Sequence, residues 1–222
     1  MYGTVATFFG LMVPHGKLAA CIDQLEEAMQ ALRRTPYHEV LGRSFLHQTN
    51  SAAEYITEFH RKASKKINVA AMYFEINGFT INPDRWYFDG FAYRAAGDIW
   101  ELEWLAHWDA DTGNSQFTLT GMESVQEAFQ NCYCDEDQPL SVKMAAELTD
   151  HLVNARYMEL IATAHAAAKQ KSRALDLKQA YPDCIFGRCR GRLRARSFSA
   201  SCHRPRSLGS DFGLTFDNFF LG

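Results

Sequence analysis

The sequence lacks long apolar runs and the common catalytic signatures. None of its apolar runs approaches the ~18 residues that a membrane-spanning helix needs. A Gly-rich phosphate loop, a Gly-x-Ser-x-Gly nucleophile elbow and a His-Glu-x-x-His zinc helix are also missing. We therefore expect a soluble, cytoplasmic protein with no membrane partner. The missing motifs lower the expectation of an enzyme without excluding one.

The six cysteines lack the spacing of a disulfide or zinc framework. Cys132 and Cys134 are separated by one residue and have no matching second pair. Reduced thiols in a cytosolic protein are the simplest interpretation of this pattern. We predict neither a cofactor nor a bound metal ion.

Lysine is absent from the C-terminal part of the chain, and charge is divided unevenly along it. Residues 1–182 hold 16 Lys and Arg against 23 Asp and Glu, a net charge of −7. Residues 183–222 hold 7 Arg and 3 Asp, a net charge of +4. An acidic body argues against nucleic acid as its primary partner, because phosphate contacts need Lys and Arg. A chain of 222 residues, 47% of them hydrophobic, suits one domain with an appendage.

The appendage is an Arg-rich tail over 182–222, which has little hydrophobic periodicity and which we expect to be loosely ordered. Its closely spaced bases are Arg188, Arg190, Arg192, Arg194 and Arg196. Three interpretations stay open. The arginines could bind DNA or RNA through phosphate contacts. The three tail cysteines and His203 could gather a zinc ion, although no Cys-x-x-Cys pair is present. Finally, the tail could be a non-native extension from a shifted reading frame, since its composition departs sharply from average usage.

Hydrophobic periodicity divides residues 1–181 into helices and strands. Helices are predicted over 17–34 and 51–67, with a short one after Thr120. A helical region over 142–180 is predicted to be either one long helix or two helices with an unmarked bend. A buried strand is predicted at 4–13. The strands of a following meander are predicted at 69–76, 79–81, 86–94, 99–108 and 116–119. Asn77-Gly78 predicts a hairpin, because both central positions of a type I′ turn need positive φ.

The order of these elements indicates an α+β fold. We predict an antiparallel sheet of about five strands with helices packed mainly on one face, all within a single domain over 1–181.

The tryptophans are concentrated in one block. All four fall between Trp86 and Trp108, and three lie four residues apart in an acidic setting. In a strand over 99–108, alternation places Trp100, Leu102, Trp104, Ala106 and Trp108 on one face. We expect that apolar face to pack under the helices.

The opposite face of this predicted strand is polar. It holds Glu101, Glu103 and His107, and Asp89 is available from the neighbouring strand. Carboxylates beside an imidazole suit general acid–base catalysis or a divalent metal. A solvated strand face also needs polar residues, and the same face could bind a partner.

The leading functional prediction is an acidic protein-binding module that masks a basic partner, as a bacterial immunity or antitoxin-type protein would. Clustered Trp, Tyr and Glu support it, because these residues anchor interfaces and steer charged partners. The candidate binding residues are Asp89, Glu101, Glu103, His107, Trp108, Asp109 and Asp111. The alternatives are a hydrolase or metal-dependent enzyme that uses the carboxylates and His107, and nucleic-acid binding through the tail.

Overall fold

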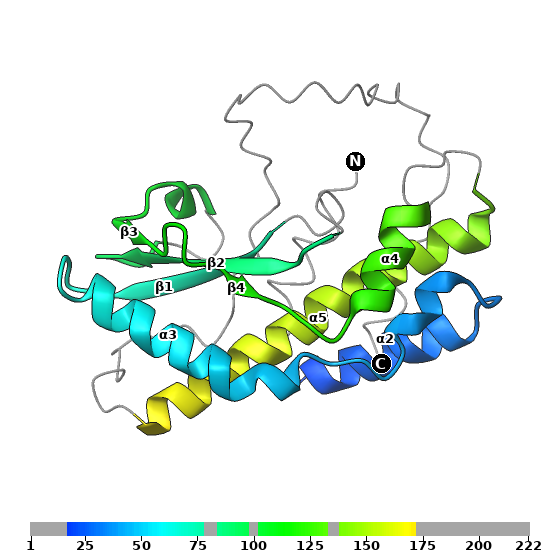
Figure 1. Cartoon of the computed structure of the whole chain (residues 1–222), viewed down its shortest axis with the longest axis horizontal. Helices are drawn as coiled ribbons and strands as arrows, with labels where there is room; N and C mark the ends of the chain where they lie inside the picture. The colour runs from blue at the N-terminus through cyan, green and yellow to red at the C-terminus, as the bar shows by residue number, and fades with distance from the viewer. Residues whose placement is uncertain (1–16, 78–83, 98–101, 133–137, 172–222) are drawn as a thin grey trace, which may run out of the picture. The chain divides into compact units, whose positions relative to one another are not determined.

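A computed structural model of the chain is shown in Figure 1, and it describes residues 17–77, 84–97, 102–132 and 138–171. Within these ranges the fold is α+β, with four helices and an antiparallel four-stranded sheet. This confirms the predicted fold class, with four strands where about five were expected. The predicted strand 4–13, the segment 79–81, Glu101 and the Arg-rich tail lie outside the described residues.

The helices form where the apolar spacing predicts them. Their bounds are Leu18–Gln30 for α2, Thr49–Ala63 for α3, Glu123–Cys132 for α4 and Leu140–Lys171 for α5. Three short 3₁₀ helices accompany them: η1 over Pro36–Val40, η2 over Leu46–Gln48 and η3 over Leu102–Ala106. The inward residues of α2 include Ile22, Leu25 and Met29, which recur at helical spacing and are all buried.

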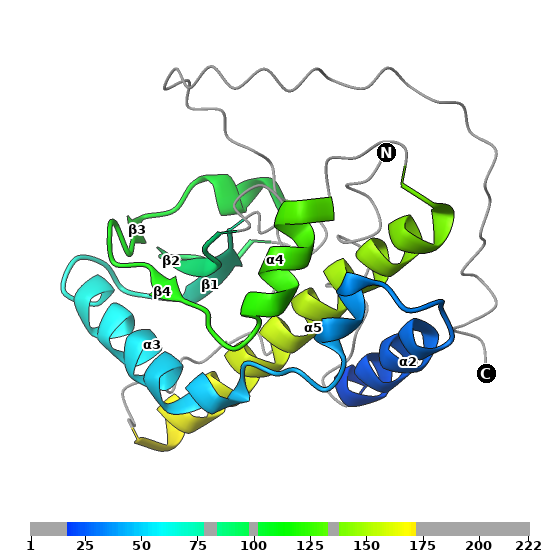
Figure 2. The same ribbon diagram turned by 45° about the vertical axis from the view of Figure 1, so that its right-hand side comes forward.

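Helix α5 is the central element of the fold. It spans 32 residues without a break and lies beside both α2 and α3 (Figures 1 and 2). Leu152, Ala155 and Tyr157 are all buried although they point in well-separated directions around the helix axis. Such burial on several sides is typical of a core helix rather than a surface one. Arg156 ties α5 to α2, since its Nη2 donates to Glu26 Oε1 at 2.8 Å.

The sheet is built around one central strand. Strand β1 (Ala71–Ile76) pairs antiparallel along its whole length with residues Phe88–Tyr93 of β2 (Tyr87–Tyr93). Its other edge pairs with β3 (Ala110–Asp111) near one end and with β4 (Phe117–Thr118) near the other. Residues 112–116 therefore interrupt what would otherwise be one continuous strand beside β2.

The strand register assigns each side chain to one of two sheet faces, because directly opposed residues share a face. Phe74 opposes Gly90, and Ile76 opposes Phe88. This face packs on the helices: the Phe88 ring lies 5.3 Å from that of Tyr55 on α3 and 5.5 Å from that of Tyr157 on α5.

The contact between sheet and α3 is close at Gly90. A Cβ atom at this position would lie 2.9 Å from Phe74 and 3.0 Å from Phe59 of α3. Glycine is the residue that allows the two rings to meet over β2.

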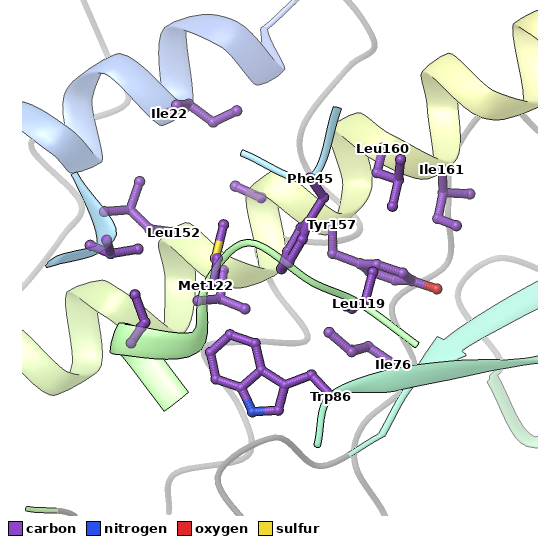
Figure 3. Packing of buried hydrophobic residues seen from close by; sticks show 14 of the residues in the cluster. Ile22, Phe45, Ile76, Trp86, Leu119, Met122, Leu152, Tyr157, Leu160 and Ile161 are labelled. Atoms are coloured by element: carbon purple, nitrogen blue, oxygen red, sulfur yellow. The ribbon is translucent and has the colours of Figure 1, made fainter. Parts of the chain in front are cut away.

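The main core lies beyond the other end of β2, where Trp86, just before the strand, is buried. Figure 3 shows Tyr157 reaching toward Ile76 and Leu119 in the same core.

One predicted strand is wrong. Residues 102–106, expected to lie in a strand over 99–108, form the 3₁₀ helix η3 instead. Spacing of four residues between tryptophans fits two periods of a strand and also about one turn of a helix, so the pattern alone did not distinguish them. The hairpin predicted at Asn77-Gly78 lies partly outside the described residues. The amide of Asn77 donates to the Tyr87 carbonyl at 2.9 Å, extending the pairing of β1 with β2.

Candidate functional site

The sheet face that points away from the helices is covered at one end by the segment 102–108. The Trp104 ring lies 4.8 Å from the Tyr93 ring, and the Trp108 ring lies 5.1 Å from the Phe91 ring. The Tyr93 hydroxyl donates to the Leu105 carbonyl at 3.1 Å. These contacts correct the prediction that the tryptophans pack under the helices. Trp104 and Trp108 pack on the opposite face, in a small core with Tyr93.

Beyond this small core, and reaching up to Phe91 and Trp108 at its border, the face carries acidic and aromatic side chains that are exposed or half-buried. We call this surface the Asp89 patch. It comprises Glu75, Arg85, Tyr87, Asp89, Phe91, Trp108 and Asp111.

Two carboxylates of the patch oppose each other across the hairpin. In the register of β1 and β2, Glu75 is the direct partner of Asp89. Directly opposed like charges destabilise an antiparallel pair by a few tenths of a kcal/mol to ~1 kcal/mol. The register thus brings two acidic residues side by side on the face away from the helices.

Asp89 also holds the segment that interrupts the sheet edge. Its carboxylate accepts hydrogen bonds of 3.4 Å from the Thr112 hydroxyl and from the Gln116 side-chain amide. The Thr112 hydroxyl in turn accepts from the Gly90 amide at 3.1 Å. Tyr55 of α3 fastens the same segment, because its hydroxyl donates to the Ser115 carbonyl at 2.6 Å. Asp89 thus has a structural role besides any role in binding.

The environment of Asp89 raises the pKa of its carboxyl above the ordinary value. Burial is the largest cause, and the negative charge of Asp111 acts in the same direction. Hydrogen bonds from Gln116 and Thr112 and the positive charge of Arg85 act against this rise. Burial and the charge of Asp111 therefore outweigh the groups that stabilise the charged form of Asp89.

Arg85 lies over the aromatic part of the patch. Its guanidinium carbon lies 5.0 Å from the centroid of the Tyr87 ring, within the range of a cation–π contact. Its Nε and Nη2 donate to the Thr118 hydroxyl at 3.2 and 3.0 Å. Since Thr118 opposes Tyr87 in the sheet, Arg85 is held above the same face that carries Asp89.

The other predicted acids divide into two groups. Asp111 belongs to the patch: it accepts from the Trp108 indole Nε1 at 3.0 Å and from the Gly113 amide at 3.0 Å. Asp109 is engaged elsewhere, because it accepts from the Arg94 amide at 2.8 Å and pairs with the Arg94 guanidinium at 3.5 Å. Asp109 therefore closes the turn after β2.

The predicted catalytic constellation is not assembled as a strand face. Glu103 lies on η3 and His107 directly follows it, and both side chains are exposed. Glu101 lies outside the described residues. Across the described part of the chain, no group of three or more His, Cys, Asp and Glu side chains is placed to hold a metal ion. Glu103 and His107 therefore do not share a strand face with Asp89, which the enzyme hypothesis required.

Sequence reasoning missed Glu75, Arg85 and Tyr87. The position of Glu75 opposite Asp89 depends on the register of β1 against β2, which the sequence does not specify. For Arg85 and Tyr87 the signal was their alternation with Asp89 into the start of β2, which could have placed them on the same face as Asp89.

Among the described helices, none is long and apolar enough to cross a membrane. The tail arginines Arg188 to Arg196 lie outside the described residues. Comparison with known proteins gives no match: no family model, no curated protein and no solved structure is significantly similar to the chain.

Proposed function

We propose that this chain is a protein-binding module and that the Asp89 patch recognises a basic protein partner. The observation that carries the proposal is the direct opposition of Glu75 and Asp89 on the sheet face away from the helices. An immunity- or antitoxin-like masking of a basic protein, in the cytoplasm of a bacterium, is the biological form that we propose for this activity.

The physical argument starts from the charges. A cationic side chain of the partner would be attracted both to Asp89 and to Glu75, which opposes it in the register. Its positive charge would also stabilise the ionised carboxylate of Asp89, whose pKa burial raises. The net charge of −7 over residues 1–182 would attract a basic partner from a distance and speed its association.

The aromatic residues of the patch supply the second requirement of an interface. Tyr87, Phe91 and Trp108 are half-buried, so each ring has surface left to contact a partner. Trp and Tyr are among the residues that most often carry the binding energy of protein interfaces. Their position beside carboxylates suits a partner segment that presents both basic and apolar groups.

The test compares two double variants with the same change in charge. Glu75→Gln/Asp89→Asn removes the opposed acids of the patch, whereas Asp23→Asn/Glu103→Gln removes two exposed acids, on α2 and η3. Each protein is used to capture partners from the native cell at about 50 and about 200 mM salt, concentrations across which exposed charges become more strongly screened.

We expect a basic protein whose recovery falls with salt and falls by about five-fold or more with the patch variant, since removing an interface charge costs on the order of 1 kcal/mol or more. The control variant should recover it nearly as well as the wild type does. Equal recovery by the two double variants, or the absence of any basic protein, contradicts the proposal.

A further inference from the structure

We propose that the Asp89 patch is selective for arginine over lysine, and that Arg85 occupies part of it until an arginine of the partner displaces it. This inference rests on the proposed function and specifies the side chain that is recognised.

The first support is the position of Arg85 itself. A guanidinium already lies over the Tyr87 ring at 5.0 Å and is held there by two hydrogen bonds to the Thr118 hydroxyl. Arg85 is otherwise exposed. In the described part of the chain it forms no ion pair with a carboxylate, so the ring and the hydroxyl are the groups that hold it. The patch thus already accommodates one guanidinium group, that of Arg85.

The second support is the arrangement of ring and carboxylate. Tyr87 and Asp89 are alternate residues of β2, which places them about 7 Å apart along one face. A planar guanidinium can stack on the ring and donate through its edge to the carboxylate at the same time. An ammonium group is compact and strongly hydrated, so it gains less from the ring.

The third support is that Asp89 has capacity left for a ligand. Its two hydrogen bonds, from Thr112 and Gln116, are long at 3.4 Å each. Among the described residues no Lys or Arg forms an ion pair with it. Arg85 lies close enough for its charge to act on Asp89 without neutralising it.

Displacement of Arg85 follows from these contacts. An arginine that stacks on Tyr87 needs the place where the Arg85 guanidinium lies, so the two compete. Removing the Arg85 side chain should therefore strengthen the binding of an arginine ligand, and it should also remove a repulsive charge. Removing the ring should reduce the preference for arginine and leave the attraction of Asp89 for any cation.

The experiment titrates the full chain with hexa-arginine and with hexa-lysine, two probes of equal charge, and measures each dissociation constant by calorimetry. The variants are Arg85→Gln, Tyr87→Leu and Asp89→Asn, with Glu103→Gln as the control outside the patch. Thermal unfolding of every variant confirms that it is folded. We expect the wild type to bind hexa-arginine several-fold more tightly than hexa-lysine, on the scale of one exposed cation–π contact.

The variants separate the two proposals. Arg85→Gln should tighten hexa-arginine binding by about three-fold or more, and Tyr87→Leu should bring the two peptides close to equal affinity. Equal affinity of the wild type for both peptides, with loss in Asp89→Asn, overturns the selectivity but leaves the basic-partner function standing. Weaker hexa-arginine binding by Arg85→Gln overturns the displacement. If neither peptide binds, or if Asp89→Asn binds both as the wild type does, the function of the patch fails as well.

Discussion

Asp150 lies on the central helix α5, and its environment raises the pKa of its carboxyl to about 6. Burial is the main cause, and the negative charge of Glu147, one turn earlier, adds to it. A hydrogen bond of 2.7 Å from the Asn154 side-chain amide opposes the rise without cancelling it. The folded protein therefore holds a carboxylate at neutral pH in a place that favours the neutral acid.

The stability consequence follows from the two pKa values. A rise from 3.8 to about 6 corresponds to roughly 3 kcal/mol between the charged and neutral forms. Asp150 is only partly buried by surface area, so solvent reduces this cost, and we expect about 1–3 kcal/mol. The folded state binds the proton more tightly than the unfolded state. The free energy of unfolding should therefore fall as pH rises from about 4 to about 6, and this contribution should be constant above that range.

Asp150→Asn removes the titration and keeps an oxygen that can accept from Asn154. We expect it to stabilise the protein by about 1–3 kcal/mol at pH 7 and to have little effect near pH 4, measured by urea unfolding across that range. Burial lowers the pKa of the adjacent His151, and its titration is present in both proteins, so it largely cancels in their difference. Asp23→Asn on α2 is the exposed control. A difference between Asp150→Asn and wild type that is the same at pH 4 and pH 7 would refute the reasoning.

Two further predictions concern the packing around the sheet and α2. Gly90→Ala should lower the free energy of unfolding by about 1–3 kcal/mol in chemical denaturation, because the new methyl group would meet Phe59 and Phe74 at 2.9–3.0 Å; an unchanged value would mean that the rings move aside freely. Cys21 is buried, and burial raises the pKa of its thiol to about 11 from 9.0. Its alkylation by iodoacetamide at pH 8, followed by mass spectrometry of its peptide, should be about 100-fold slower in the folded protein than in urea; equal rates would contradict this burial.

The helices were the part of the fold that the sequence predicted best. The apolar residues of α2 and those around α4, such as Met122, Val125 and Phe129, repeat at helical spacing and are buried as expected. Local periodicity is enough for such elements, since one stripe of side chains decides which face is buried. For the region 142–180 the sequence left one helix or two open, and α5 is a single helix up to Lys171, where the described residues of that segment end.

The sheet was predicted less well, because its pairing depends on contacts between distant residues. Strand β2 was expected from its alternation, and β4 lies within the strand predicted at 116–119. Strand β3 and the division of one edge of β2 between β3 and β4 were not expected. The interruption at 112–116 is maintained by Asp89, Thr112 and Tyr55, which come from three separate segments. No window of local sequence contains that information.

The tryptophan block shows how one error in secondary structure changes the candidate site. A strand over 99–108 would align Glu103 and His107 with Asp89 and would supply an acid–base pair. The 3₁₀ helix η3 instead turns Trp104 and Trp108 down onto Tyr93 and Phe91, leaving Glu103 and His107 in solvent. Trp104 and Trp108 thus cover the end of the sheet face that carries Tyr93 and Phe91. The candidate site consequently moves from the Trp-rich segment to β1 and β2, where strand register brings Glu75 opposite Asp89.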